Sequence, residues 1–419
     1  LHMTERLLQY IWQFRYFSSS MLHTTTRQVL QIINPGTYNT NQGPDFLNAK
    51  IKVDGTIWAG SVELHIRTSE WLVHKHSQDS NYNNVILHVV WINDMEPQLP
   101  FPALELQHIV PKLLLDKYNN LMHGTKLIPC ENQLRNIESI NLLAWKTRLL
   151  SERLQTKTIQ VAHFLKLNKM NWEETCWWML ARNLGAKVNS DAFEKIARSI
   201  PLNLLGKHRH QFIQLEAILM GQAGLLNKPF EEDYPAMLQK EFIFLQHKYK
   251  LKNPHAPLYL LRMRPANFPT IRLSQLANLI YNNDHLFSKF SEATGISSIE
   301  KILSVSANDY WHYHYLFDVP TSFKIKNTGK HMIRNIMINT VVPMIHAYGQ
   351  VYNNEKYINK SIQWLTDLPA EQNNITAAFK KMGIENNSAY DSQALIQLKH
   401  FYCDQKRCLQ CAIGNSILK

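Results

Sequence analysis

Residues 43–68 read GPDFLNAKIKVDGTIWAGSVELHIRT, and this stretch decides how the N-terminal part of the chain folds. Apolar and polar residues alternate over 47–53 and again over 56–68. Such alternation is typical of two β-strands that each bury one face. The Asp54-Gly55 pair between them is typical of a tight turn. The stretch therefore predicts a β-hairpin.

Three side chains of this hairpin point to chemistry. Successive side chains of a strand point to opposite faces, so Glu63 and His65 share one face of the second strand. Asp45 lies at the bend before the first strand, and antiparallel pairing is expected to bring it towards Glu63. Two facing carboxylates repel one another unless a cation lies between them. We therefore expect Asp45 and Glu63 to hold Mg²⁺ or Mn²⁺, with His65 positioning or activating a water, or binding the metal itself.

The sequence around the hairpin predicts a fold of the α+β class. Apolar residues at helical spacing predict a helix over 4–17, and short apolar runs predict strands at 29–33 and 85–92. The later sequence has the pattern of a series of helices and contains few glycines. We therefore expect a small α/β domain over 3–130, followed by a large, mostly helical domain over 131–419.

The order of these elements resembles the PD-(D/E)XK nuclease superfamily. In that superfamily a helix precedes a hairpin that carries Pro-Asp and then Glu-x-Lys; here Pro44-Asp45 and Glu63-Leu64-His65 stand at these places. The resemblance covers about residues 4–95 and implies a restriction-endonuclease-like fold with metal-dependent cleavage of DNA or RNA. His65 replaces the usual lysine, and a histidine can act as a base but supplies no constant positive charge at pH 7.

The same resemblance implies further site residues. Glu5 stands where some members carry an acidic residue in the first helix. Gln78 and Tyr82 match the Gln-x-x-x-Tyr pattern of the RecB-like members. Apart from the resemblance, Asp79 is a further polar candidate, because it lies just ahead of the predicted strand at 85–92.

Four of the 19 histidines, His65, His74, His76 and His88, lie close together in the sequence. The His74-x-His76 pair is suited to a transition metal or to a phosphate group, and ordinary turn contacts are the alternative. His88 lies within an apolar stretch, where a hydrogen-bonded core histidine is expected. Together, His65, His74 and His76 leave open a His-rich metallohydrolase that holds zinc tightly.

Five cysteines are too few for a disulfide framework, which favours a reducing cytoplasm. Cys403, Cys408 and Cys411 follow the pattern C-x4-C-x2-C, and three such thiolates can bind one zinc ion or one iron–sulfur cluster together with a fourth ligand. Cys130 and His400 are the candidates for that ligand. One early and three late cysteines are similar to the iron–sulfur site of some RecB-like nucleases. The alternative is three reduced thiols on an amphipathic helix.

Charge separates the two predicted domains. Basic residues exceed acidic ones by 12, and residues 1–130 hold ten of each sign, so the excess lies in 131–419. A basic surface suits a polyanion, because neutralised phosphates release counterions. Nucleic acid is therefore the expected partner, and the candidate contacts lie at a predicted helix start and in a loop: Lys207, Arg209, Arg262, Arg264 and Arg272. The alternative is that the loop arginines are structural.

No apolar stretch approaches the roughly 20 residues that span a bilayer. The start of the chain lacks the basic and then apolar order of a secretory signal, so we expect a cytoplasmic protein. The whole chain also resembles an uncharacterised bacterial family, a domain of unknown function, in phrases such as 62–65 and 264–269 and in its cysteine-rich end. That resemblance implies no activity.

We therefore predict a metal-dependent nuclease that hydrolyses phosphodiester bonds of DNA or RNA. In this hypothesis Asp45 and Glu63 hold the cation and His65 positions or activates water. One alternative is a non-catalytic nucleic-acid-binding or assembly module in which the replacement at His65 marks lost chemistry. The other alternative is the His-rich metallohydrolase.

Overall fold

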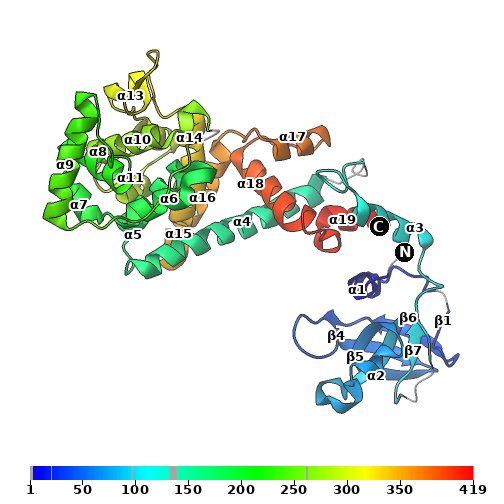
Figure 1. The fold of residues 1–419 in the computed structure, drawn as a ribbon. Helices are drawn as coiled ribbons and strands as arrows, with labels where there is room; N and C mark the ends of the chain where they lie inside the picture. The colour runs from blue at the N-terminus through cyan, green and yellow to red at the C-terminus, as the bar shows by residue number, and fades with distance from the viewer. Residues whose placement is uncertain (1–2, 20, 96–98, 133–138, 261–262, 419) are drawn as a thin grey trace. The chain divides into compact units, whose positions relative to one another are not determined.

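The computed structural model describes the chain apart from residues 1–2, 20, 96–98, 133–138, 261–262 and 419. The chain forms two compact units (Figure 1). The first, called the sheet unit below, comprises Leu1–Trp145 and Leu398–Lys419; the second, called the helical unit, comprises Lys146–Gln397. The expected combination of a sheet-containing N-terminal part and a mostly helical part is confirmed.

The last segment of the chain belongs to the sheet unit, although the sequence placed it in the domain over 131–419. Helix α19 (Ala412–Leu418) packs against α3 (Lys112–His123). The Nζ of Lys406 donates a hydrogen bond to the carbonyl oxygen of Gly124 at 2.6 Å. Local periodicity does not report which distant segment covers a helix face, so this division could not be obtained from the sequence.

Within the described residues, the sheet unit is built on one mixed seven-stranded sheet in the order β1-β2-β4-β5-β6-β7, with β3 pairing with β4. Strands β1 to β5 pair in antiparallel fashion, whereas β5, β6 and β7 are parallel to one another. The strands are β1 Leu22–His23, β2 Val29–Asn34, β3 Thr37–Tyr38, β4 Phe46–Val53, β5 Thr56–Arg67, β6 Val85–Ile92 and β7 Ala103–Glu105.

The predicted hairpin is confirmed as β4 and β5, joined at the pair Val53 and Thr56. Asp54 and Gly55 have φ angles of 44° and 90°. Two left-handed residues in succession give the turn whose twist matches that of the strands, and glycine adopts this conformation without strain.

A β-bulge lies at the start of β4. Phe46 pairs with Val62 and Ala49 with Gly60, so β4 carries one extra residue in this interval. Asn48 accommodates the bulge with a φ angle of 58°. Alternation predicted a buried Leu47, but the bulge leaves its side chain exposed.

The helices of the sheet unit are short. Helix α1 (Glu5–Phe14) begins after Thr4, whose hydroxyl accepts the N–H of Leu7 at 3.3 Å. It ends before residue 17, where the sequence predicted its end, because Arg15 adopts a left-handed conformation with a φ angle of 54°. Helix α2 (Glu70–Val73) follows β5 and lies beside it (Figure 1).

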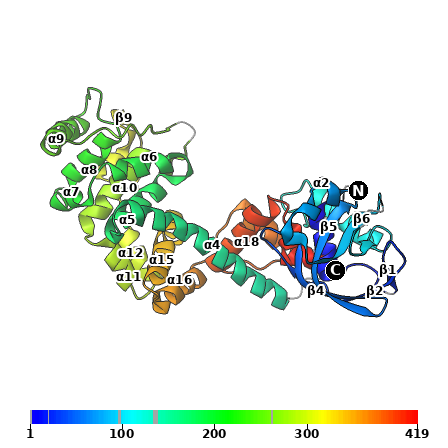
Figure 2. The same cartoon turned by 90° about the horizontal axis from the view of Figure 1, so that it is seen from below.

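The helical unit contains α4 Ser139–Leu167, which starts in the sheet unit, α5 Trp172–Leu184, α6 Ala186–Arg198, α7 Leu202–Lys207, α8 Phe212–Gln222, α9 Asp233–Tyr249, α10 Pro269–Asn282, α11 Leu286–Glu292, α12 Ile296–Leu303, α13 Asp309–Tyr313, α14 Lys330–Ile336, α15 Val342–Val351, α16 Glu355–Asp367, α17 Asn374–Lys381 and α18 Ala389–Gln397, with a two-stranded ribbon of β8 His314–Leu316 and β9 Val319–Pro320. Helices α15 and α16 pack side by side, as do α8 and α9 (Figure 2). No helix in the described part of the chain is both long and apolar enough to cross a membrane.

In the part of the chain that the structure describes, two segments adopt the wider π-helical turn. One, Met337–Val341, joins α14 to α15, and the other, Leu398–Cys403, follows α18. Wider helical turns of this kind are frequent at functional sites. The first lines a cavity of the helical unit, and the second ends at one of the cysteines singled out by the sequence.

Candidate metal centre

Two parallel strands and the segment between them bring four histidines together. Strand β5 carries Glu63 and His65, and its parallel neighbour β6 places His88 in register with Glu63. The segment between these strands carries His74 and His76, just after α2. The site is therefore built by the crossover from one parallel strand to the next.

The imidazole of His65 lies in the middle of the cluster. Its Nε2 is 3.1 Å from Nδ1 of His74 and 3.3 Å from Nε2 of His76, and its Nδ1 is 2.8 Å from Nε2 of His88. The Oε1 of Glu63 lies 3.7 Å from Nε2 of His65 and 3.6 Å from Nε2 of His76. Glu63 and His65 are 5% and 1% exposed, whereas His74 is exposed to solvent. The cluster therefore has a buried side and an open side.

Donor atoms at these separations are suited to a single ion. A tetrahedral ion with bonds of about 2.0 Å sets its ligand atoms about 3.3 Å apart. The distances from His65 Nε2 to the other two imidazoles are close to that value. The ligand atoms of His65, His74 and His76 all lie within 4.8 Å of one another. Glu63 is not part of this compact group, and its Oε1 approaches only His65 and His76. The three imidazoles can therefore hold a divalent transition metal, with a carboxylate oxygen on the side of His65 and His76.

His88 is a member of this cluster that the sequence assigned to the core. A neutral imidazole carries one N–H, so His65 can offer Nε2 to a metal when its Nδ1–H donates to Nε2 of His88. Such a second group fixes the tautomer and the orientation of a ligating imidazole. The ring of Trp71 contacts the rings of His65, His76 and His88 and closes the buried side. His88 is buried and hydrogen-bonded, as the sequence predicted, but its contact with His65 depends on the register of β5 with β6, which the sequence does not report.

Asp45 and Glu63 lie next to each other, and each carboxyl group accepts a backbone N–H from the other strand. The N–H of Asp45 donates to Oε2 of Glu63 at 3.0 Å, and the N–H of Leu64 donates to Oδ2 of Asp45 at 3.1 Å. The side chain of Gln9 on α1 donates to the remaining oxygen of Asp45 at 2.8 Å. The two predicted carboxylates therefore do meet, and Glu63 keeps one oxygen directed at the imidazoles.

Burial shifts the pKa values of both carboxyl groups and of the buried imidazoles. It raises the pKa of Asp45 to about 7 and that of Glu63 to about 9, and neighbouring carboxyl groups, including Glu5, add to both shifts. Burial also lowers the pKa of His65 to about 2 and that of His88 to about 4. At neutral pH the metal-free site therefore holds a protonated Glu63 beside the neutral imidazoles of His65 and His88, and a nearby cation would favour the ionised form of Glu63.

We expect the metal-free protein to lose stability between about pH 6.5 and pH 8.5. Glu63 keeps its proton in the folded chain up to a pKa of about 9, whereas the unfolded chain has released it above 4.5. Folding therefore takes up a proton in this range, which costs about 1.4 kcal/mol per pH unit. At lower pH, His65 and His88 offset this cost, because the unfolded chain binds protons that these buried rings do not.

Urea unfolding in the presence of a chelator, at several pH values across this range, measures the effect. The variant Glu63→Gln should show a flatter dependence on pH, because its amide does not titrate. Equal slopes in the wild type and the variant would contradict the assigned pKa of Glu63.

Comparison with known proteins places the chain in a family. Residues 5–374 match the family described as a protein of unknown function, DUF2851. The chain belongs to this family. The match confirms the expected resemblance to an uncharacterised family, and it ends before the three late cysteines. No curated protein and no solved structure matches the chain. The resemblance to the PD-(D/E)XK nucleases stays a prediction.

Tyr82 and Glu5, both predicted site residues, lie beside the centre. The ring of Tyr82 stacks on that of His76 with centroids 3.9 Å apart. Burial and the charges of Glu63 and Asp45 raise the pKa of Tyr82 to about 12. Burial likewise raises the pKa of Glu5, which lies close enough to Asp45 and Glu63 to affect both.

Gln78 and Asp79 have local positions in the segment before β6. Gln78 ends the short helical turn that starts at His76. The Oδ1 of Asp79 accepts hydrogen bonds from the backbone and the side chain of Asn81 at 2.9 and 2.8 Å. The carboxylate of Asp79 therefore caps the next turn.

Four buried, free thiols gather in the sheet unit, and they belong to Cys130, Cys403, Cys408 and Cys411. Burial raises the pKa of Cys130 to about 12, and the thiols of Cys411 and Cys408 add to the shift. Burial raises the pKa of Cys403 too, with contributions from the other three thiols. Cys130 is therefore the predicted fourth ligand that lies near the C-x4-C-x2-C thiols, and its role as a ligand stays a prediction. His400 instead has a half-exposed side chain, with its Nδ1 3.1 Å from Oδ2 of Asp404.

The chain wraps closely around Cys411. Burial raises the pKa of this thiol to about 11, and the N–H groups of Gly414 and Ile413 donate to its sulfur and oppose that rise. A Cβ at position 414 would lie 2.1 Å from the carbonyl oxygen of Cys408, so the turn closes only with glycine there. N–H groups directed at a cysteine sulfur stabilise the thiolate form that binds metals and clusters.

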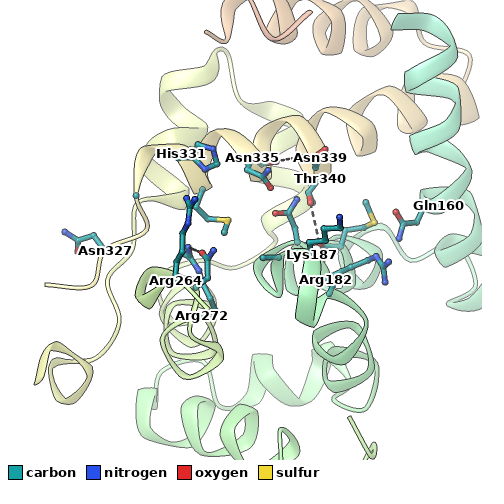
Figure 3. Close-up of a pocket in the computed structure, with 17 residues that line it drawn as sticks. Gln160, Arg182, Lys187, Arg264, Arg272, Asn327, His331, Asn335, Asn339 and Thr340 are labelled. Atoms are coloured by element: carbon teal, nitrogen blue, oxygen red, sulfur yellow. Dashed lines mark hydrogen bonds between the residues drawn. The ribbon is translucent and has the colours of Figure 1, made fainter. Parts of the chain in front are cut away.

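The predicted nucleic-acid contacts lie in different surroundings. Helix α7 ends at Lys207, so the helix start predicted there is wrong, because residues 208–211 separate α7 from α8. The guanidinium of Arg209 is neutralised by Asp284 at 2.8 Å. Arg264 and Arg272 line a cavity of the helical unit (Figure 3). Arg262 lies outside the described residues.

Proposed function

We propose that the sheet unit is a metal-dependent nuclease, which hydrolyses phosphodiester bonds of DNA or RNA at a cation held by Glu63 and imidazoles. One observation carries the proposal: Oε1 of Glu63 and the Nε2 atoms of His65 and His76 converge within 3.7 Å of one another on a largely buried surface. Burying so many ionisable groups is costly and is typical of functional sites.

The donor set favours a transition metal over Mg²⁺. Mg²⁺ takes oxygen ligands in proteins, whereas imidazoles suit Zn²⁺ and related ions. The three imidazole nitrogens therefore favour Zn²⁺ at this centre, whereas Mn²⁺ would depend more on the carboxylate oxygen of Glu63. His65 is a weak base, because burial lowers its pKa to about 2, so we assign it to the metal and not to the activation of water.

The residues around the ligands have supporting roles in this proposal. His88 orients His65, and Gln9 holds Asp45 beside Glu63. Asp45, with a pKa of about 7, is poised to exchange a proton at neutral pH. A bound cation would lower the pKa of water and stabilise charge on a phosphoryl group. Substrate would approach from the open side, at His74.

Nucleic acid is the proposed substrate for two reasons. The chain carries a net charge of +12, and its excess of basic residues lies outside the first 130 residues, where it suits a polyanion. The order of helix, hairpin, Pro-Asp and Glu-x-His also resembles nucleases of the PD-(D/E)XK type.

Elemental analysis and a cleavage assay test the proposal together. Protein purified without chelators should contain zinc or manganese that is lost in the variant His65→Ala, and should cleave DNA or RNA until a chelator is added. Bound metal without cleavage of either nucleic acid would favour the non-catalytic module. Failure to bind zinc or manganese after reconstitution would remove the proposal.

We propose that the four gathered cysteines bind an iron–sulfur cluster. Among the described residues, the groups of three or more ligand atoms within 4.8 Å of one another do not include these sulfurs. Four thiolates around one zinc ion lie closer than this, because the Zn–S bond is only about 2.3 Å. An iron–sulfur cluster contains several atoms and so holds its thiolates farther apart than one zinc ion does, which is compatible with sulfurs that form no group within 4.8 Å. If these cysteines bind zinc and no iron, the proposed iron–sulfur cluster is wrong, although the cysteines still form a metal site.

A further inference from the structure

A polar cavity of about 610 Å³ lies in the helical unit, between α5, α6, the start of α10 and the helix that runs from α14 into α15. Figure 3 shows Arg264 and Arg272 on one side of it, Lys187 and Arg182 on the other, and Asn335 and Thr340 above. Its volume is in the range of sites for small ligands and cofactors.

The charged side chains that line this cavity are all basic. Among the described residues that line it, none is Asp or Glu. Arg182 is neutralised from outside, since Asp191 and Glu194 lie 2.6 Å from its Nη1. The side chains of Lys187, Arg264 and His331 are exposed at the cavity. The cavity therefore concentrates positive charge that its own lining does not neutralise.

The buried guanidinium of Arg272 is a second, independent indication that the cavity binds an anion. Its side chain is buried, with the residue 4% exposed, and its Nη1 and Nη2 donate to the amide oxygens of Gln275 and Asn267 at 2.8 and 2.9 Å. Its Nε has no hydrogen-bond partner among the described residues. A buried guanidinium held by neutral amides alone is costly, and an anion in the cavity would offset that cost.

Amide side chains supply the rest of the lining. Five asparagines and one glutamine face the cavity, and the Oδ1 of Asn183 is buried without a hydrogen-bond partner among the described residues. Amides both donate and accept, as the edges of bases and the hydroxyls of sugars require. A simple carboxylate would leave most of these groups, and most of the volume, unused.

We propose that this cavity binds the phosphate group of a nucleotide, with Arg264, Arg272 and Lys187 around the phosphate and the amides around the nucleoside. The ligand is either a free nucleotide or the terminal nucleotide of a strand, since the two share this chemistry. The site lies wholly in the helical unit and does not depend on the metal centre of the sheet unit.

Calorimetric titration of the full chain tests the proposal with the four ribonucleoside 5′-monophosphates, each beside its nucleoside. We expect at least one monophosphate to bind more than about tenfold tighter than its nucleoside. The double variant Lys187→Gln/Arg264→Gln should lose about tenfold in that affinity or more. Both changes fall on exposed side chains, so folding, checked by circular dichroism, should be retained.

The matched control is Lys195→Gln, an exposed lysine on the same helix, α6, that does not line the cavity. It should bind as the wild type does, and so should Glu63→Gln, which separates this proposal from the nuclease. A short oligothymidylate with and without a 5′-phosphate distinguishes a strand end from a free nucleotide. No binding of any monophosphate or phosphorylated strand, equal binding of the nucleosides, or an equal loss in Lys195→Gln would each overturn the proposal.

Discussion

The variant Glu63→Gln is expected to lose metal-dependent cleavage by more than about 100-fold. Glutamine has the shape of the protonated glutamic acid that burial favours in the metal-free chain, so the fold should survive. Its amide can still accept the N–H of Asp45, but its NH₂ group would take the place of the oxygen that faces His65 and His76. An amide NH₂ does not bind a cation, so the centre would lose its charged ligand.

The measurement is the rate of cleavage and the metal content of the same preparation. The matched control is Glu105→Gln on β7, the same chemical change on another strand of the sheet. It should keep both the rate and the metal. Full activity in Glu63→Gln would exclude this residue from the mechanism, and an equal loss in Glu105→Gln would show that the effect is not specific to the centre.

The variant Cys411→Ala is expected to lose the iron–sulfur cluster of the four cysteines, together with the visible absorption of protein purified without oxygen, and to keep the metal of the histidine centre. The sulfur of Cys411 receives two backbone N–H groups, and the turn that supplies them closes tightly at Gly414, so the alanine variant removes a ligand held in place by the backbone. A ligand held about 1,000-fold above its Kd contributes about 4 kcal/mol to the free energy of unfolding. We expect a loss of that order.

Cys176→Ala is the matched control, because Cys176 is equally a free and buried thiol but lies in α5 of the helical unit. This variant should lose some stability through the cavity it creates and should keep its iron in full. Iron content is therefore the deciding measurement. A full complement of iron in Cys411→Ala would contradict the four-cysteine centre, and a full complement in Cys130→Ala would exclude Cys130 as the fourth ligand.

Much of the fold was readable because its signals are local. The alternation on both sides of Asp54-Gly55 predicted the β4–β5 hairpin, and the apolar run at 85–92 predicted β6 to the residue. The two predictions that were wrong here also have local causes. A left-handed Arg15 ended α1 early, and the bulge at Asn48 turned Leu47 outwards. One residue in an unusual conformation leaves little trace in a periodic pattern.

The sequence predicted which residues belong to the candidate site better than it predicted how they contact one another. Spacing along one strand predicted that Glu63 and His65 share a face, and the hairpin predicted that Asp45 would come near them. The contact of His65 with His88 depends on the register between parallel strands that the sequence separates by a crossover. Periodicity within a strand contains no information on that register.

By itself, the sequence determined the hairpin, the longer strands beside it, the helical character of the later chain and the inventory of acids, imidazoles and thiols, because these depend on neighbours within a few residues. Only the tertiary structure decided which of them meet. It set His88 against His65, placed Cys130 near enough to the late thiols for them to raise its pKa, and left Arg272 buried without an acidic partner in its cavity. The reason is physical: ligands converge through strand register and the packing of distant segments, and these minimise the free energy of the whole fold and not of any short stretch.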